Sequence, residues 1–184
     1  MLPLIVLLVI SLVVIAVGVA MYNGLIRSKN QVENAWSQID VQLKRRLDLI
    51  PNLVETVKGY AAHEQETFQQ VIAARNAAIE APDTPAGQAQ PNELLTGALG
   101  KLFALSEAYP DLKANQNFLA LQEELTATEG RVAYARQFYN DSVLDYNNKI
   151  ESVPTVFLAK MLGYQQREYF EADEAARAVP NVDF

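Results

Sequence analysis

The sequence predicts an all-α protein with an N-terminal transmembrane helix and an elongated antiparallel helical bundle, made of two long helices and shorter packed helices. Three observations predict this class. The first 26 residues carry no charge and are mostly apolar. Apolar residues then recur every three or four positions, the period of a helix face. No stretch alternates apolar and polar residues as a half-buried strand does. The predicted domains are an anchor (1–26), a bundle (27–180) and a tail (181–184).

Residues 1–26 are predicted to be a membrane anchor because their apolar run is long. Thirteen residues between Leu4 and Ala20 are Leu, Ile or Val. Lipid contact through residues 4–22 matches a hydrocarbon core of about 30 Å, with Tyr22 at the interface. The alternative is a cleaved signal peptide. Such peptides have a basic segment before a shorter apolar core, and no Lys or Arg precedes this run.

The distribution of basic residues predicts the orientation of the chain. Arg27, Lys29 and the Lys44–Arg46 cluster follow the span, and only the α-amine precedes it. The positive-inside rule therefore places the N-terminus outside and the bundle in the cytoplasm. A periplasmic bundle is the alternative, because Lys44–Arg46 lie at some distance from the span.

A first long helix is predicted from about Val32 to Ile79. Pro51 removes one backbone donor and should kink this helix, but the apolar phase continues on both sides of it. Between the anchor and this helix only Gly24 weakens the helical pattern, so the two form one continuous helix or bend at that glycine. The apolar stripe comprises Val32, Trp36, Ile39, Leu43, Leu47, Ile50, Val54, Val57, Ala61, Phe68, Ile72 and Ile79.

Three further segments follow before residue 153. Residues 81–92 hold three prolines and a glycine and are predicted to be a loop. Asn92 would cap a short helix over residues 93–107. A second long helix is predicted from Pro110 or Asp111 to just before Val153. Its stripe has nearly the spacing of a heptad seam and comprises Phe118, Leu121, Leu125, Thr128, Val132, Ala135, Tyr139, Val143, Tyr146 and Ile150.

The C-terminal part is predicted to contain two shorter pieces. A short apolar helix covers residues 154–162, with Gly163 as its terminator. A last amphipathic piece covers roughly residues 166–178 and ends at Pro180. These helices would pack on the two long ones.

The composition excludes several classes of function. The net charge is −7, and an acidic domain is a poor binder of nucleic acid. The chain has no cysteine, which excludes thiol nucleophiles and Cys-based zinc sites. It has one histidine, His63, whereas carboxylate-bridged di-metal bundles need two Glu-x-x-His pairs. We therefore predict no catalytic, cofactor-binding or metal-binding residue, no cofactor, no nucleic acid and no small-molecule substrate.

The remaining polar features are interpreted as structural. His63 stands among acidic residues and is expected to be a solvated surface side chain. Glu129 lies beside the second stripe, where it is expected to form a salt bridge with Arg75 or Arg131. A catalytic role for this carboxylate is the less favoured alternative, because carboxylates on helices usually form a solvated face.

Two clusters have an alternative interpretation. The Lys44–Arg46 cluster is interpreted as one solvated turn, although it could contact anionic lipid. Tyr134, Tyr139 and Tyr146 lie on or near one helix face. They are expected to be core aromatics with a hydrogen-bonding tip rather than a cofactor box.

Several motifs resemble the signature of the LemA family of bacterial membrane proteins. They are Asp40–Arg46 with Asp48–Tyr60, Tyr109–Asn115, Ala135–Asp141 with Tyr146–Asn147, and the terminal Val182–Phe184. The resemblance covers nearly the whole chain. It implies a single-span protein of the bacterial cytoplasmic (inner) membrane with a helical bundle on the cytoplasmic side. Relatives occur among the proteins of magnetosome membranes, and no catalytic activity comes with the family.

These features lead to two main hypotheses. The first is a non-enzymatic scaffold, a homo-oligomer that self-associates on the membrane and organises or curves it. The second is a membrane-tethered adaptor that presents a helical surface to a signalling or envelope partner protein. An enzyme is a third reading, which would need a buried polar pocket that a seam of Leu, Val and Tyr does not suggest.

Overall fold

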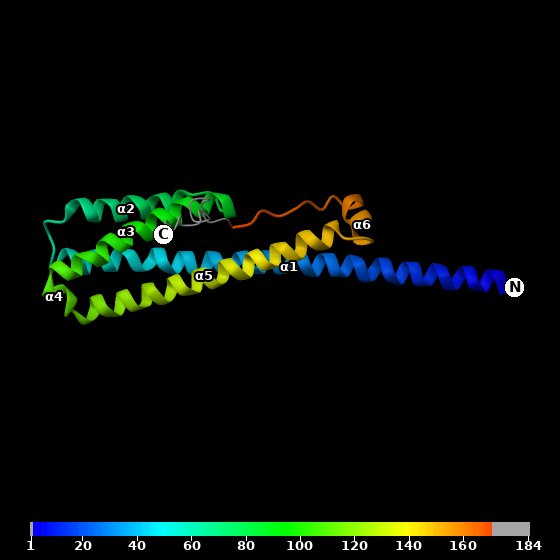
Figure 1. Cartoon of the computed structure of the whole chain (residues 1–184), viewed down its shortest axis with the longest axis horizontal. Helices are drawn as coiled ribbons and strands as arrows, with labels where there is room; N and C mark the ends of the chain where they lie inside the picture. Colours follow the sequence, from blue (N-terminus) through cyan, green and yellow to red (C-terminus); the bar gives the residue numbers. More distant parts are fainter. Residues whose placement is uncertain (1, 171–184) are drawn as a thin grey trace, which may run out of the picture. The chain divides into compact units, whose positions relative to one another are not determined.

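The structure, a computed structural model, describes residues 2–170 and holds six helices and no strand within that range. The helices in Figure 1 are α1 (Leu2–Lys58), α2 (Gln65–Glu80), α3 (Pro85–Ala108), α4 (Pro110–Lys113), α5 (Gln116–Glu151) and α6 (Thr155–Met161). The predicted all-α class is confirmed. The chain divides into two compact units. Unit 1 takes in the residues up to Ser37 together with Gln137–Glu168, and unit 2 takes in Gln38–Arg136 and the chain from Tyr169 onward.

Helix α1 joins the predicted anchor to the first bundle helix without a break at Gly24. It is 57 residues long and contains the one stretch of the described chain that is long and apolar enough to cross a membrane. Farther along, the helix also continues through Pro51, with Ile50 and Leu53 fully buried on either side. A kinked helix that continues across this proline was predicted; its continuity is confirmed, and the kink stays a prediction.

A specific contact compensates for Pro51. Proline has no N–H, so the Leu47 carbonyl one turn earlier loses its usual backbone partner. In unit 2 the Arg75 side chain of α2 donates from Nε to this carbonyl at 3.0 Å. A carbonyl left unpaired by a helical proline needs such a substitute donor. Arg75 thus supports the first helix rather than pairing with Glu129.

The prediction that the first long helix reaches Ile79 is wrong. Helix α1 ends at Lys58, and α2 begins at Gln65. The backbone N–H groups of Tyr60 and Ala61 both donate to the Val57 carbonyl, at 3.0 and 2.9 Å, and form a turn. Because Ala61 in this turn is itself buried in the core, the three- or four-residue spacing of apolar positions hides the break.

The buried face of α2 also differs from the predicted stripe. Helix α2 buries Phe68, Val71, Ala74 and Ala78. Ile72 and Ile79, both predicted to be buried, are 40% and 51% exposed. The turn resets the helical phase, so the stripe of the first helix cannot be extended through it.

Helix α3 begins eight residues before the predicted Glu93, within the expected loop. The Thr84 hydroxyl accepts a hydrogen bond from the Gly87 N–H at 3.1 Å, and Pro85 takes the first helical position. A capping threonine followed by proline is a helix start, and here it outweighs the composition of the stretch. Asn92, predicted to be a cap, lies inside α3 and donates to the Gln88 carbonyl at 2.8 Å.

The second long helix starts at Gln116, after the separate turn α4, rather than at Pro110. The Asn115 side chain caps it by accepting a hydrogen bond from the Phe118 N–H at 2.9 Å. Every predicted seam position is buried except Leu121, which is partly buried. The predicted end of this helix and the short helix α6 are confirmed, and Gly163 after α6 has a φ of 72°.

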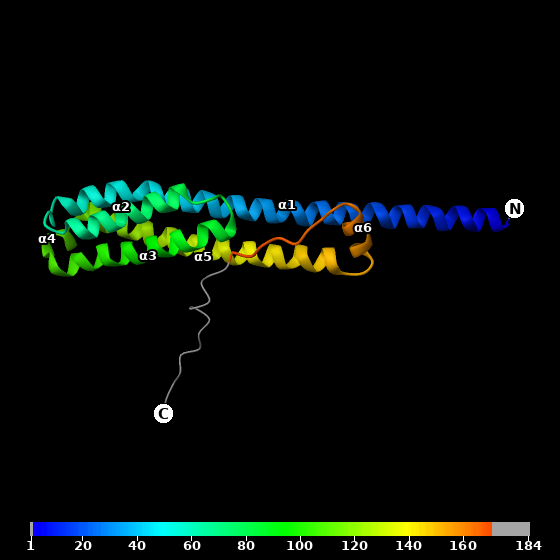
Figure 2. The same ribbon diagram turned by 90° about the horizontal axis from the view of Figure 1, so that it is seen from above.

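In unit 2, α1 and α5 run antiparallel, because Arg45 pairs with Glu124 at 2.6 Å while Tyr60 bonds to Asn115. Helices α2 and α3 lie side by side in both views (Figures 1 and 2). The unit 2 core is formed mainly by Ile50, Leu53, Val54, Val57, Phe68, Val71, Leu95, Leu99, Leu102, Leu112, Phe118 and Leu125.

In unit 1, α1 and α5 are again antiparallel. The Trp36 and Tyr139 rings meet edge to face with centroids 5.6 Å apart, and the Lys149 ammonium donates to the Gly24 carbonyl at 3.3 Å. The chain after α6 has no helix over residues 164–170, so the predicted amphipathic helix is wrong in its first part. The rest of that piece and the predicted tail 181–184 lie outside the described residues.

Candidate functional site

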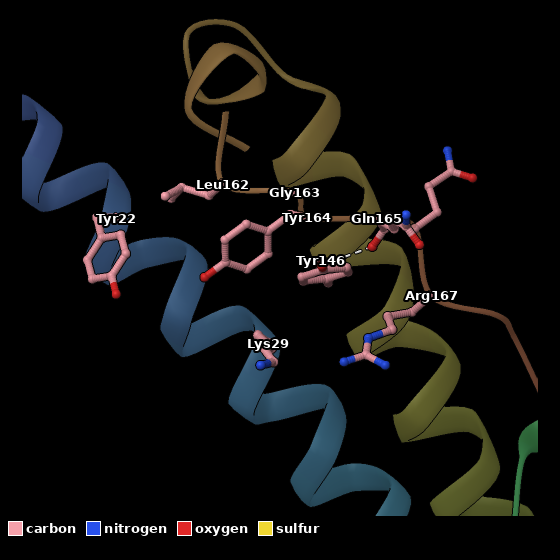
Figure 3. Close-up of a pocket in the computed structure, with 9 residues that line it drawn as sticks. Tyr22, Lys29, Tyr146, Leu162, Gly163, Tyr164, Gln165 and Arg167 are labelled. Carbon is pink, nitrogen blue, oxygen red and sulfur yellow. Dashed lines mark hydrogen bonds between the residues drawn. The ribbon is translucent and has the colours of Figure 1, made fainter. Parts of the chain in front are cut away.

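A pocket of about 540 Å³ lies in unit 1 between α1, α5 and the chain that follows α6 (Figure 3). Figure 3 shows the Tyr164 ring between Tyr22 of α1 and Tyr146 of α5. The pocket is lined by Tyr22, Lys29, Tyr146, Leu162, Gly163, Tyr164, Gln165, Gln166 and Arg167. The lining therefore combines aromatic rings with two cationic side chains.

Residues 164–168, here called the strap, are held by side chains of α5, and residues 164–167 of the strap line the pocket. The Tyr146 hydroxyl donates to the Gln165 carbonyl at 3.0 Å, and the Tyr139 hydroxyl donates to the Glu168 carbonyl at 2.9 Å. A segment without helix leaves its backbone groups in need of partners, and these side chains supply them.

Asn147 adds a two-way contact with the strap. Its side-chain nitrogen donates to the Arg167 carbonyl at 3.0 Å, and its side-chain oxygen accepts from the Arg167 N–H at 2.9 Å. Asn147 is 8% exposed, so both bonds form away from solvent. An amide side chain that satisfies both backbone groups of one residue fixes that residue in place.

Two of the three predicted core tyrosines behave as expected. Tyr139 and Tyr146 are buried with hydrogen-bonded hydroxyls, whereas Tyr134 is 72% exposed, so the prediction is wrong for Tyr134. Burial raises the pKa of Tyr139 and of Tyr146, although the nearby Arg167 opposes the rise in both. The two phenols are therefore protonated donors at neutral pH.

The charged rim of the pocket centres on Glu33. This carboxylate lies 3.7 Å from the Lys29 ammonium and 3.5 Å from the Arg167 guanidinium. All three side chains are 40–53% exposed, so each pair contributes little to stability. Both cations therefore share the Glu33 carboxylate, and a second carboxylate, Glu151, accepts a hydrogen bond from the lining residue Gln166. The lining itself holds no histidine, serine or carboxylate, and it offers aromatic and polar contacts.

Unit 2 contains a buried cation, Arg46. Its side chain is 3% exposed, and Nη2 lies 3.0 Å from Glu129 Oε2 and donates to the Thr96 hydroxyl at 2.7 Å. Burial lowers the pKa of Arg46, and the Glu129 carboxylate opposes that change. The cluster Lys44–Arg46 was predicted to be a solvated turn, and this is wrong for Arg46.

The partner predicted for Glu129 also needs correction. Glu129 forms a salt bridge, but with Arg46 and not with Arg75 or Arg131. Arg131 pairs instead with Glu124 at 3.3 Å. The Glu129 side chain is 46% exposed, so it is half-buried and not enclosed in the core.

His63 lies exposed in the turn between α1 and α2, as predicted for a surface histidine. Within residues 2–170, no three His, Asp or Glu side chains gather closely enough to hold a metal ion. The expectation that the chain has no catalytic, cofactor-binding or metal residue stays a prediction.

Two buried polar side chains, Arg46 and Asn147, were not predicted. The sequence carries a signal for the first of them only. Arg46 comes three residues after Leu43 and four before Ile50, so its position alone placed it on the apolar face. Asn147 follows the seam residue Tyr146 directly. Its partner is twenty residues away in a segment without periodicity, and no local signal connects the two.

The sequence is similar to known proteins over most of its length. It matches the LemA family over residues 35–184. Magnetosome protein MamQ 2 of Paramagnetospirillum magneticum is 27% identical over 179 residues, covering 84% of this chain and 66% of that protein. Magnetosome protein MamQ of Magnetospirillum gryphiswaldense is 27% identical over 193 residues, covering 91% of this chain and 71% of that protein. Protein LemA of Metamycoplasma hominis is 29% identical over 161 residues, covering 84% of this chain and 71% of that protein. The match with MamQ 2 thus spans just under two thirds of that relative.

Proposed function

The chain belongs to the LemA family, and from this premise we propose that it is a membrane-anchored, non-enzymatic helical scaffold that self-associates on the bacterial membrane and organises or curves it. The observation that carries the proposal is helix α1. One helix begins at Leu2 among exposed apolar side chains and ends at Lys58 beside the buried core. A helix of this kind connects a lipid-facing segment directly to a packed bundle.

The first part of α1 suits a bilayer and not water. Its large apolar side chains from Leu2 to Val19 are 49–76% exposed. Thirteen Leu, Ile and Val side chains favour insertion by roughly 4 to 8 kcal/mol in total, at ~0.3 to 0.6 kcal/mol each. The relatives named as magnetosome proteins support a membrane setting for this chain as well.

The proposed topology is a single span in the bacterial cytoplasmic membrane with the bundle in the cytoplasm. The chain has no cysteine, so one introduced by Ala86→Cys in the exposed first turn of α3 would report on its side of the membrane. In intact cells, a membrane-impermeant maleimide should label position 86 only after the membrane is opened. Labelling of intact cells would place the bundle in the periplasm.

Self-association draws its support from α2. Ile72 and Ile79 are seven residues apart, so they lie on one helix face, and both are exposed. Two exposed isoleucines at heptad spacing form an apolar stripe like those that pack against a second helix in a coiled coil. In a scaffold, this face would pack against a second copy of the bundle.

The mass of the full-length protein in mild detergent tests this proposal. Light scattering should give defined oligomers for the wild type and a smaller species for the double variant Ile72→Asp, Ile79→Asp. Val41→Asp is the matched control, because Val41 is also exposed, at 58%, but lies on α1. A wild-type monomer across several detergents and in bilayers would overturn the scaffold and favour the adaptor.

A further inference from the structure

The segment from Val153 to Leu162, which contains α6, exposes unusually large apolar side chains. Outside residues 2–22, the described chain holds four large apolar side chains that are 70% exposed or more. One is Tyr134 in unit 2. The other three belong to this one segment, Val153 at 76%, Phe157 at 70% and Met161 at 75%, and Leu162 follows at 43%. Their exposure equals that of the apolar side chains at the start of α1.

Two of these side chains lie on one face of the short helix α6, and Val153 and Leu162 flank its ends. Phe157 and Met161 are four residues apart, so they project from the same face of α6. Ala159, at 2% exposure, forms the opposite side, which packs on unit 1. An exposed apolar face in water has no stabilising partner, and a contiguous patch of this kind marks an interaction site.

The position of the segment indicates what covers the patch. The Lys149 ammonium near the end of α5 reaches the Gly24 carbonyl, and Leu162 and Tyr22 line the same pocket. Tyr22 and Gly24 stand where the apolar part of α1 ends. Figure 1 likewise draws α6 beside α1, beyond the end of α5. Within unit 1, the patch is therefore level with the edge of the predicted membrane span.

The charges in the segment fit the same surface. Lys160 is exposed on α6 between Phe157 and Met161. Interfacial helices combine aromatic and aliphatic side chains with basic ones that reach toward lipid phosphates. Arg27 and Lys29 follow the span on α1 and are of the same sign.

We infer that the segment Val153–Leu162 is a second membrane contact, an interfacial helix whose Phe157 and Met161 side chains enter the boundary between head groups and acyl chains beside the anchor. This inference rests on the proposed membrane anchor. It adds a second contact, which restricts the tilt of unit 1 relative to the bilayer, because tilting would lift the interfacial helix out of the lipid. The occupant of the patch is the lipid surface itself.

Spin-label depth measurements on the full-length protein in vesicles test this inference. The vesicles contain phosphatidylcholine and phosphatidylglycerol, and each variant carries one nitroxide on a single introduced cysteine. Met161→Cys reports on the patch, Val9→Cys on the anchor and Leu94→Cys on an exposed apolar position of unit 2, at 57% exposure. For position 161, the ratio of collisions with oxygen to collisions with a water-soluble nickel complex should be severalfold higher than for position 94.

The three positions separate failure of the inference from failure of the proposed function. A label at position 9 that lies in lipid while the label at position 161 lies in water would overturn the interfacial helix alone. A label at position 9 in water would overturn the membrane anchor and the inference with it. If the label at position 161 is poorly accessible to both oxygen and nickel and shows spin–spin broadening that disappears on dilution with unlabelled protein, a second copy covers the patch, and the lipid contact is wrong.

A second variant tests whether the Phe157 side chain holds the segment in the bilayer. Phe157→Glu in the Met161→Cys background should lower the oxygen-to-nickel ratio at position 161 severalfold. Phe157 is exposed, so this change leaves the core intact. Tyr134→Glu is the matched control at equal exposure in unit 2 and should leave the ratio unchanged. An equal effect of both variants, or of neither, would contradict the role of Phe157.

Discussion

In unit 2, α1 and α5 lie against a core of buried Leu, Ile, Val and Phe side chains, whereas in unit 1 α5 holds the strap through hydrogen bonds from Tyr139, Tyr146 and Asn147. Apolar burial is non-directional and adds up over many contacts. Hydrogen bonds are directional, and each contributes only about 1 kcal/mol net. The strap should therefore detach locally at a cost well below that of unfolding the core of unit 2.

The largest effect is expected in the core of unit 2. Phe118 is 1% exposed and packs edge to face on Phe103, with centroids 6.2 Å apart. Phe118→Ala should lower the free energy of unfolding by about 3 to 5 kcal/mol, measured by chemical denaturation. The control is its neighbour, Leu119→Ala, because Leu119 is 46% exposed. Similar losses for both variants would show that Phe118 is not part of a packed core.

A smaller, local effect is expected in unit 1. Asn147→Ala removes both hydrogen bonds to the Arg167 backbone. It should lower the free energy needed to detach the strap from α5 by about 1 to 3 kcal/mol. Hydrogen exchange of the Arg167 amide should become faster, while amides in the core of unit 2 keep their protection. Asn148→Ala, at an exposed position of the same helix, is the control. Faster exchange throughout unit 2 would mean that the two units do not open separately.

A double-mutant cycle tests the compensation for Pro51. Arg75→Met should destabilise the protein by about 1 kcal/mol, because it leaves the Leu47 carbonyl without a donor. In a Pro51→Ala background the backbone gains an N–H at position 51, and the cost of Arg75→Met should fall by at least half. Denaturation midpoints of the four proteins give the coupling. Equal costs in both backgrounds would exclude the proposed role of Arg75.

The smallest effect concerns alkaline pH. The pKa values of Tyr139 and Tyr146 are raised by burial, so the stability that they contribute is complete below the usual tyrosine pKa of about 10. It is lost as the pH rises through the raised values. Ionised Tyr139 should quench the fluorescence of Trp36, its ring neighbour. The quenching step should therefore appear only above about pH 10, and Tyr139→Phe should remove it. Quenching below that pH would contradict the burial of this phenol.

The sequence predicted the features that depend on one continuous helix. The buried seam from Phe118 to Ile150 was predicted correctly, because these residues lie on one uninterrupted helix with a constant number of residues per turn. The stripe failed at the turn after Lys58, where the chain reverses while its apolar spacing continues. The same turn explains why Ile72 and Ile79 are exposed. Periodicity records the distance between apolar residues and not the direction of the chain.

The features that were not predicted depend on partners far away in the sequence. Arg46 was interpreted as solvated because a cluster of three basic residues is usually exposed, yet Thr96 and Glu129 from two other helices surround it. The strap from Gln166 onward was predicted to begin an amphipathic helix because of its composition. Its actual conformation is set by α5 side chains about twenty residues or more before it.

The number of chains per assembly in a lipid bilayer tests the scaffold most directly. Full-length protein labelled with a fluorophore through Ala86→Cys can be reconstituted in vesicles at low density and bleached one fluorophore at a time. A self-associating scaffold should bleach in several steps per spot, and the double variant Ile72→Asp, Ile79→Asp should shift the distribution toward one step. Single-step bleaching of the wild type at every protein-to-lipid ratio would contradict self-association.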